Sequence, residues 1–198
     1  MAGTFPNTNY SGLNLKSNQR TLTSIADDGT TYTRQIDNQR FSLTLSFPIQ
    51  SKADFMPVIG FLMKQRSKKE SFTLPLPTGI GNARGTAAGS PTGTASAGDT
   101  TITLAGTGTG SLLSGDLITF GNHDKVYMVV DDASDISATN TLTIEPPLRE
   151  AVSGTAISFD NLNMTVRLTS DLQEYSAGTV DKDGNLVFNF ELDVIEAL

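Results

Sequence analysis

The chain has no cysteine and no tryptophan, and it contains a single histidine. Without cysteine it forms neither disulfides nor cysteine-ligated zinc sites, so the fold has to be stable without covalent staples. The absence of tryptophan weakens the case for a sugar-binding surface, because carbohydrate sites usually present exposed aromatic rings. Any pair of a hydroxyl nucleophile and a histidine base would have to use His123.

Long apolar runs are also missing. No stretch approaches the ~18 apolar residues that a membrane-spanning helix needs, so we expect no membrane partner. The first residues, Met1-Ala-Gly-Thr-Phe-Pro6, have neither the basic nor the apolar region of a secretory signal. With 198 residues, 37% of them hydrophobic, the chain suits one large or two small globular domains.

The net charge of −7 is unevenly distributed, with a basic excess in residues 1–82 and an acidic excess in residues 83–198. An acidic chain is a poor general nucleic-acid binder, because affinity comes mainly from neutralising phosphates. Acidic surfaces can let DNA pass without binding, but the charge could equally serve only solubility.

Motifs that carry chemistry are nearly absent. His123 lies in the loop 121–125, where we expect a solvated turn residue. The glycine-rich runs Gly106–Gly110 and Gly79–Gly85 lack the G-K-[ST] ending of a phosphate loop, so we interpret both as turns. No G-x-S-x-G sequence presents a nucleophilic serine.

Two acidic segments are weak candidates for cation sites. Asp181-Lys-Asp-Gly184 resembles the start of a calcium loop, but Leu192 stands where a bidentate glutamate is required. Asp131, Asp132 and Asp135 could hold a cation weakly, although a solvated acidic loop fits them better. We therefore predict that the protein is not an enzyme and has no catalytic, cofactor-binding or metal-binding residues and no cofactor.

The segment 40–77 is the most informative part of the chain. Phe41-Ser-Leu-Thr-Leu-Ser-Phe47 alternates apolar and polar residues, as a half-buried strand does. Residues 51–63 change to helical spacing, and residues 71–77 form a short apolar strand that ends in prolines. The apolar residues that we expect on one face of this helix are Phe55, Ile59, Leu62 and Met63.

Two starting points are open for this helix. Ser51 and Asp54 form a capping box, which places the start directly after Ser51. Pro57 fits a helix only in its first turn, which would instead start the helix at Asp54 with Ser51 outside it. Lys64 and Arg66 lie at the far end, where positive charge suits the helix dipole.

The flanking segments predict further strands. Asp27-Asp-Gly-Thr30 is a hairpin turn that joins strands near residues 20–26 and 30–36. Residues 78–98 are small, polar and glycine-rich, and we interpret them as a flexible linker at a domain boundary. In residues 99–159, short β-branched runs predict a five-stranded barrel. Its expected strands are 100–105, 116–120, 125–131, 141–145 and 155–159.

Alternation returns at the C-terminal end. Leu162, Met164, Val166 and Leu168 share one face, and a long strand is expected over residues 186–195. We therefore predict a mainly β fold: a split β-sandwich with one α-helix, plus an inserted small OB-like or SH3-like β-barrel. The expected domains are 1–82 with 160–198, a tail-tube-like sandwich, and 83–159, the barrel.

The order of strand, helix and strand resembles the distal tail and minor tail proteins of long-tailed bacteriophages. The matching residues are Phe41-Ser-Leu-Thr-Leu-Ser-Phe-Pro48, the helix from Phe55 to Met63, and Ser71-Phe-Thr-Leu-Pro75. The resemblance covers about the first 80 residues and, more loosely, the last 40. It implies a virion structural protein, made in the host cytoplasm, that forms a ring in the phage tail, expected to be a hexamer.

The resemblance also implies partners: other copies of the chain, the tail-tube protein, and the baseplate or tip hub protein. DNA would pass through the lumen without specific binding. We expect the strand 186–195 to offer a pairing edge, with Glu191 and Asp193 towards the lumen and Leu192 and Val194 opposite. The alternatives are a tail-tube subunit, and a carbohydrate- or receptor-binding module acting through the barrel.

Overall fold

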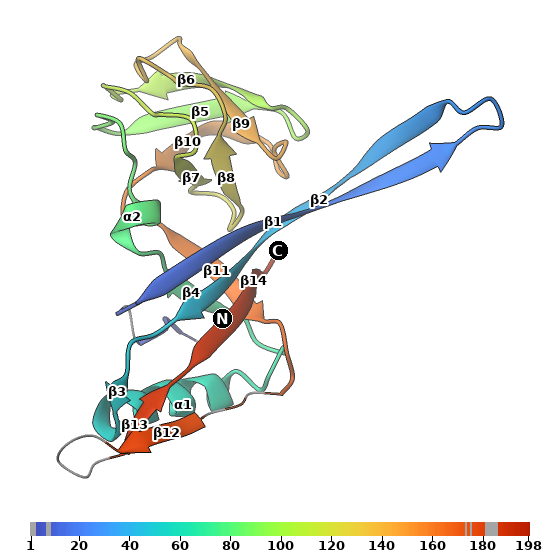
Figure 1. The fold of residues 1–198 in the computed structure, drawn as a ribbon. Coiled ribbons are helices and arrows are strands. Elements are labelled where there is room, and N and C mark those ends of the chain that lie inside the picture. Colours follow the sequence, from blue (N-terminus) through green and yellow to red (C-terminus); the bar gives the residue numbers. More distant parts are fainter. Residues whose placement is uncertain (1–2, 7–8, 173, 175, 181–185) are drawn as a thin grey trace.

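The computed structural model describes residues 3–6, 9–172, 174, 176–180 and 186–198. Its strands form an open five-stranded sheet, a closed six-stranded barrel and a small three-stranded sheet beside helix α1 (Lys52–Lys64), as Figure 1 shows. The protein is therefore mainly β. Its open sheets form a sandwich-like arrangement, and the barrel segment is inserted in the chain between residues 72–75 and 163–168, two strands of the five-stranded sheet.

The five-stranded sheet is the centre of the molecule, and all its neighbouring strands are antiparallel. Its order is β1 (Gly12–Ile25), β2 (Thr31–Ser46), β14 (Glu191–Glu196), β11 (Asn163–Leu168) and β4 (Phe72–Pro75). The alternation in β2 and β11 is confirmed, because every second side chain is buried on one face of the sheet. These buried side chains are Phe41, Leu43, Leu45, Met164, Val166 and Leu168.

Helix α1 (Lys52–Lys64) begins directly after Ser51, as the capping box predicts. The Ser51 hydroxyl accepts a hydrogen bond from the Asp54 backbone N–H (3.3 Å) and donates one to the Asp54 carboxylate (2.7 Å). Pro57 is the sixth residue of the helix and lies in its second turn. The alternative prediction, that the helix starts at Asp54, is therefore wrong. The cap and the packing of the helix outweigh the hydrogen bond that proline cannot donate.

The prediction that Met63 lies on the buried face of this helix is wrong. Phe55, Val58 and Leu62 are buried, whereas Met63 is 67% exposed. At ~100° per residue these three residues fall within about 60° of one another, with Leu62 in the middle. Met63 lies about 100° away from Leu62, outside this stripe. Phe55 stacks on Phe188 with ring centroids 4.6 Å apart, which joins the helix to the three-stranded sheet.

The long C-terminal strand expected over 186–195 is divided between two sheets. β13 (Leu186–Asn189) lies between β12 (Ser176–Val180) and β3 (Gln50–Ser51) in the three-stranded sheet. β14 lies between β2 and β11 in the five-stranded sheet. The prediction that this strand offers a pairing edge is therefore wrong, because both of its pieces are internal strands.

The barrel closes with six strands, one more than predicted. The five expected strands correspond to β6–β10, and the additional strand, β5, lies in the segment interpreted as a linker. Helix α2 (Thr78–Gly81) lies in the same segment. The barrel strands are β5 (Pro91–Ala95), β6 (Thr101–Gly106), β7 (Leu117–Phe120), β8 (Val126–Val129), β9 (Thr141–Glu145) and β10 (Val152–Ser158).

The linker interpretation is wrong because small residues are needed there for close packing. Gly93 of β5 is buried in the barrel, where a Cβ atom would lie 2.7 Å from Ile102 Cγ2 and 3.1 Å from the Phe120 ring. A larger residue at this position could not fit without displacing its neighbours. The glycine content therefore serves barrel closure and not flexibility.

The barrel and the five-stranded sheet share a hydrophobic core. Leu117 and Val126 of the barrel belong to the same buried cluster as the inner face of the sheet, and the half-buried Met128 packs against it. Strands β5–β10 form the barrel, and the strands before and after them in the chain form the open sheets. The domain boundaries 82/83 and 159/160 stay a prediction.

We expect Leu62→Asp to lower the free energy of unfolding by at least about 3 kcal/mol, because an unpaired carboxylate would replace a fully buried side chain. Met63→Asp is the matched control on the same helix, and its cost should stay below about 1 kcal/mol because Met63 is exposed. Urea unfolding measures both. Equal losses for the two variants would contradict this packing of α1.

Candidate interaction surfaces

The most prominent surface is a hairpin arm formed by the outer halves of β1 and β2. The two strands pair from Gly12 with Ser46 to Ile25 with Thr31, with an irregularity between Asn18 and Arg20. Beyond that irregularity the hairpin projects away from the rest of the molecule (Figure 1). The predicted hairpin is therefore confirmed in position but is much longer, since β2 continues without a break into the sheet.

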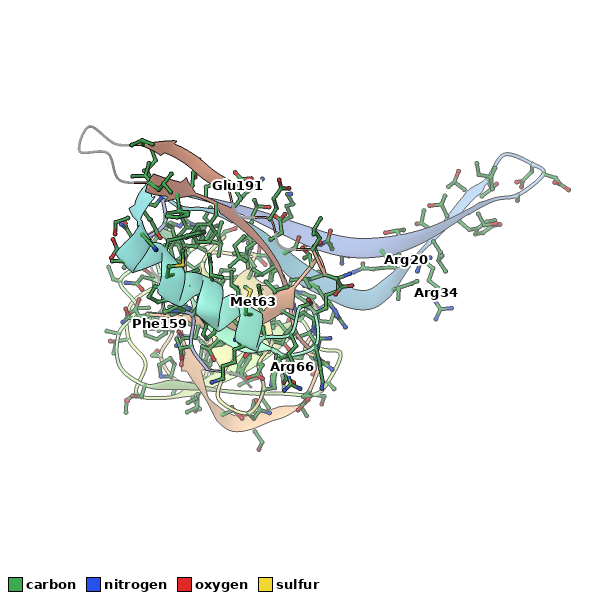
Figure 2. All side chains as sticks on the ribbon, turned by 90° about the horizontal axis from the view of Figure 1, so that it is seen from below. Arg20, Arg34, Met63, Arg66, Phe159 and Glu191 are labelled. Carbon is green, nitrogen blue, oxygen red and sulfur yellow. The ribbon has the colours of Figure 1, made fainter. Side chains whose placement is uncertain are left out.

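Nearly all of the arm, which we define as residues 20–35, is exposed to solvent. Its large side chains include Leu22, Ile25 and Tyr32, which are 50%, 71% and 62% exposed. Arg20 and Arg34 also lie on the arm, as Figure 2 shows. A two-stranded ribbon without a packing partner is marginally stable at best. A contact with another molecule would therefore stabilise the arm.

The two edges of the five-stranded sheet differ. At the β4 edge, Phe5 N–H donates to the Thr73 carbonyl (2.8 Å) and Thr73 N–H donates to the Gly3 carbonyl (3.0 Å). The N-terminal segment therefore covers that edge. Among the described strands, β1 pairs with β2 alone, which leaves its other edge open. A long open edge favours pairing with a second chain.

The outer face of the sheet is polar. Glu191 and Asp193 are exposed there, whereas Leu192 and Val194 are buried on the opposite face, as their alternation predicts. Asp193 accepts a hydrogen bond from the Thr44 hydroxyl (2.6 Å) and Glu191 accepts one from Ser46 (3.1 Å). Figure 2 shows Glu191 at this face. These bonds hold both carboxylates on the solvent side of β14.

A buried ion pair connects the barrel to the sheet. Lys125 Nζ, before β8, lies 2.5 Å from Glu196 Oε2 in β14, and it also donates to Gln39 Oε1 (2.8 Å). The Glu196 carboxylate accepts hydrogen bonds from the backbone N–H groups of Val126 (2.8 Å) and Phe41 (3.2 Å). Burial lowers the pKa of Lys125, and the charge of Glu196 opposes that shift. One carboxylate thus binds to groups from the barrel and from β2.

A groove of about 470 Å³ lies where the arm joins the body. One side consists of β2 residues, among them Gln39 and Arg40, and the other side consists of barrel loops. Residues 97–98 and 146–149 supply those loops, and Lys125 lies between the two sides. The sequence gives no local signal for this groove, because its walls come from distant segments.

His123 differs from the expected solvated residue, because it is only half-exposed and both ring nitrogens have partners. Nε2 lies 2.8 Å from the Tyr127 hydroxyl, and Nδ1 lies 2.8 Å from Asn122 Oδ1. The Tyr127 hydroxyl also accepts from the Arg149 backbone N–H, so it can donate to Nε2 of a neutral His123. Burial lowers the pKa of His123 and raises the pKa of Tyr127 to about 12. The geometry gives His123 a structural role in the β7–β8 turn.

The acidic candidates also have structural partners. Asp132 accepts a hydrogen bond from Ser114 N–H, and Asp135 accepts from the Ser137 backbone and hydroxyl. The expected turn 181–184 lies outside the described residues. Within the described part of the chain, no group of three or more histidine, aspartate or glutamate side chains could hold a metal ion. No helix there is long and apolar enough to cross a membrane.

Comparison with protein-family models gave no match, and a search of curated proteins gave none either. The arguments for function therefore depend on the surfaces described above.

We expect Lys125→Met to lower the free energy of unfolding by about 3–5 kcal/mol, because it leaves the Glu196 carboxylate buried without a counter-ion. The double variant Lys125→Met with Glu196→Gln should lose less unfolding free energy than Lys125→Met alone, since no uncompensated charge remains buried. Lys68→Met breaks the exposed pair with Asp171 and should cost less than about 1 kcal/mol. A double variant less stable than Lys125→Met would contradict this account.

We expect the protein to lose stability as the pH falls from about 7 through 6.5, because the unfolded chain then binds a proton that folded His123 binds less readily. In His123→Gln this contribution is absent, so the stability should decrease less between about pH 7.5 and 5.5 than it does in the unchanged protein. Thermal unfolding of both proteins at each pH measures the difference. Identical decreases would show that His123 titrates normally in the folded state.

Proposed function

We propose that this protein is a structural subunit of a bacteriophage tail, forming a ring that joins the tail tube to the baseplate or tip hub and lines the DNA channel. The projecting arm is the observation that carries the proposal. Residues 20–35 extend away from the body with apolar side chains exposed, an arrangement that is stabilised by association. The open edge of β1 supports association in the same region.

The outer face of the five-stranded sheet fits the lumen of such a ring. Its exposed groups include the carboxylates of Glu191 and Asp193, which repel phosphate, and the hydroxyls of Thr44 and Ser46, which are uncharged. A surface of this kind gives DNA little to bind. The expected hexamer comes from the resemblance to distal tail proteins.

A tail-tube subunit would use the same features, and the two functions differ in whether the ring occurs once or is repeated along the tail. Receptor binding through the barrel has less support. The aromatic side chains Phe120, Tyr127 and Phe159 are 3%, 0% and 7% exposed, so none offers a ring face for stacking on a sugar.

We expect removal of the outer arm to abolish ring formation without unfolding the body. Replacing residues 22–34 by Asn-Gly joins the paired residues Thr21 and Gln35 through a two-residue turn. The removed residues are almost all exposed, so the melting temperature should stay close to that of the intact chain. Native mass and electron microscopy of both proteins provide the comparison. A truncated protein that forms the same ring would show that the arm has no part in assembly.

The place of the protein in a phage particle tests the proposed function itself. We expect labelled protein at the junction between the tail tube and the tip, in one ring. A label repeated along the tube would identify a tube subunit instead. A label confined to peripheral fibres, or absent from tails, would refute the proposal.

A further inference from the structure

The side chains that line the groove at the base of the arm carry unbalanced positive charge. Its described lining residues include Arg40, Lys125 and Arg149 and no aspartate or glutamate. Lys125 is neutralised by Glu196, whereas neither arginine forms an ion pair within the described part of the chain. The exposed Arg149 and half-exposed Arg40 are therefore available to a carboxylate that enters the groove.

The groove also has an apolar component. The half-buried Pro147 and the exposed Ala97 lie in two adjoining barrel loops of its wall, where the Gly98 N–H donates to the Leu148 carbonyl (2.7 Å). A matching occupant would combine acidic groups with a neighbouring aliphatic side chain. Arginine favours such mixed sites, because its guanidinium group binds carboxylates in a fixed geometry and is weakly hydrated.

The tip of the arm has this composition. Asp27 and Asp28 are exposed side by side in the turn, and Ile25 next to them is 71% exposed. Asp28 accepts a hydrogen bond from Thr30 N–H (2.8 Å), and this backbone bond lowers the pKa of Asp28. Asp28 is thereby fixed in the turn, while the Asp27 side chain is exposed for an external contact.

The tip of one chain cannot reach the groove of the same chain. The β2 residue of the groove nearest to the tip is Gln35, and Asp28 at the tip is seven residues further along the hairpin. At ~3.3 Å per residue an extended strand of that length spans roughly 23 Å. Figure 1 shows that the arm leads away from the barrel loops that form the other wall. An arm tip that enters the groove must therefore belong to another copy of the chain.

We propose that the arm tip of one copy docks into the basic groove at the arm base of the next copy. This inference depends on the proposed function, since it specifies how neighbouring ring subunits recognise each other. Asp27 of one copy faces Arg149 and Arg40 of its neighbour, and Ile25 covers the apolar wall. Tip and groove are different surfaces, so the contact is heterologous and repeats from copy to copy until a ring closes.

The absence of cysteine allows a direct test by disulfide trapping. Ala26→Cys places a thiol at the tip and leaves both aspartates in place, and Ala97→Cys places one at the groove. The double variant should form a ladder of cross-linked copies under mild oxidation, ending at the ring size. The matched control replaces Ala97→Cys with Ser134→Cys, an exposed barrel residue that does not line the groove. It should give at least tenfold less cross-linked product.

A charge exchange tests the chemistry of the contact. Asp27→Lys and Arg149→Glu should each lower the affinity of self-association at least tenfold, as measured by sedimentation. The double variant, in which the two charges are exchanged, should recover much of the lost affinity. If the chain forms rings but neither the ladder nor the recovery occurs, the docking inference is wrong and the ring function survives. If the full chain is monomeric at all concentrations and is also absent from tails, the docking inference and the proposed ring function are both wrong. Equal ladders with the Ser134→Cys control would also overturn the inference.

Discussion

The buried ion pair between Lys125 and Glu196 holds the barrel and the five-stranded sheet in one orientation. Glu196 is fully buried, and its carboxylate binds the Lys125 ammonium group together with two backbone N–H groups, one from β8 and one from β2. Such pairs contribute little net stability, because both charges lose their hydration. They do disfavour other orientations, in which one charge would be buried alone. The groove depends on this orientation, because its two walls come from the barrel and from β2.

Local patterns were sufficient for the elements that pack on one side only. The alternation of residues 41–47 and 162–168 correctly predicted two strands of the central sheet, and the capping box correctly predicted the start of α1. Each of these signals depends on neighbours within a few residues. The sequence also predicted the mainly β class and five of the six barrel strands, because these strands are short, β-branched and separated by turns.

Elements that depend on distant contacts could not be predicted in this way. Gly93 looks like a linker residue until Ile102 and Phe120 are placed against it. Lys125 looks like a solvated turn cation, since nothing near it in sequence indicates that Glu196 lies 2.5 Å away. The turn signal at residues 27–30 predicted the hairpin but not the length of the arm, because a ribbon exposed on both faces has no apolar period to detect. Of the candidate surfaces, the groove and the buried ion pair were therefore unpredictable from sequence.

The arm is difficult to explain as part of an isolated molecule. Residues 20–35 add almost nothing to the hydrophobic core, yet ordering each backbone residue costs about 1–2 kcal/mol in conformational entropy. Contacts that bury Leu22 and Tyr32 on one face of the ribbon and Ile25 on the other would offset part of that cost. If neighbouring copies dock as we propose, ribbon order and ring closure would be coupled, because each arm would be stabilised by the neighbour that it joins. Such coupling would disfavour partial rings, whose terminal copies would leave an arm or a groove unoccupied.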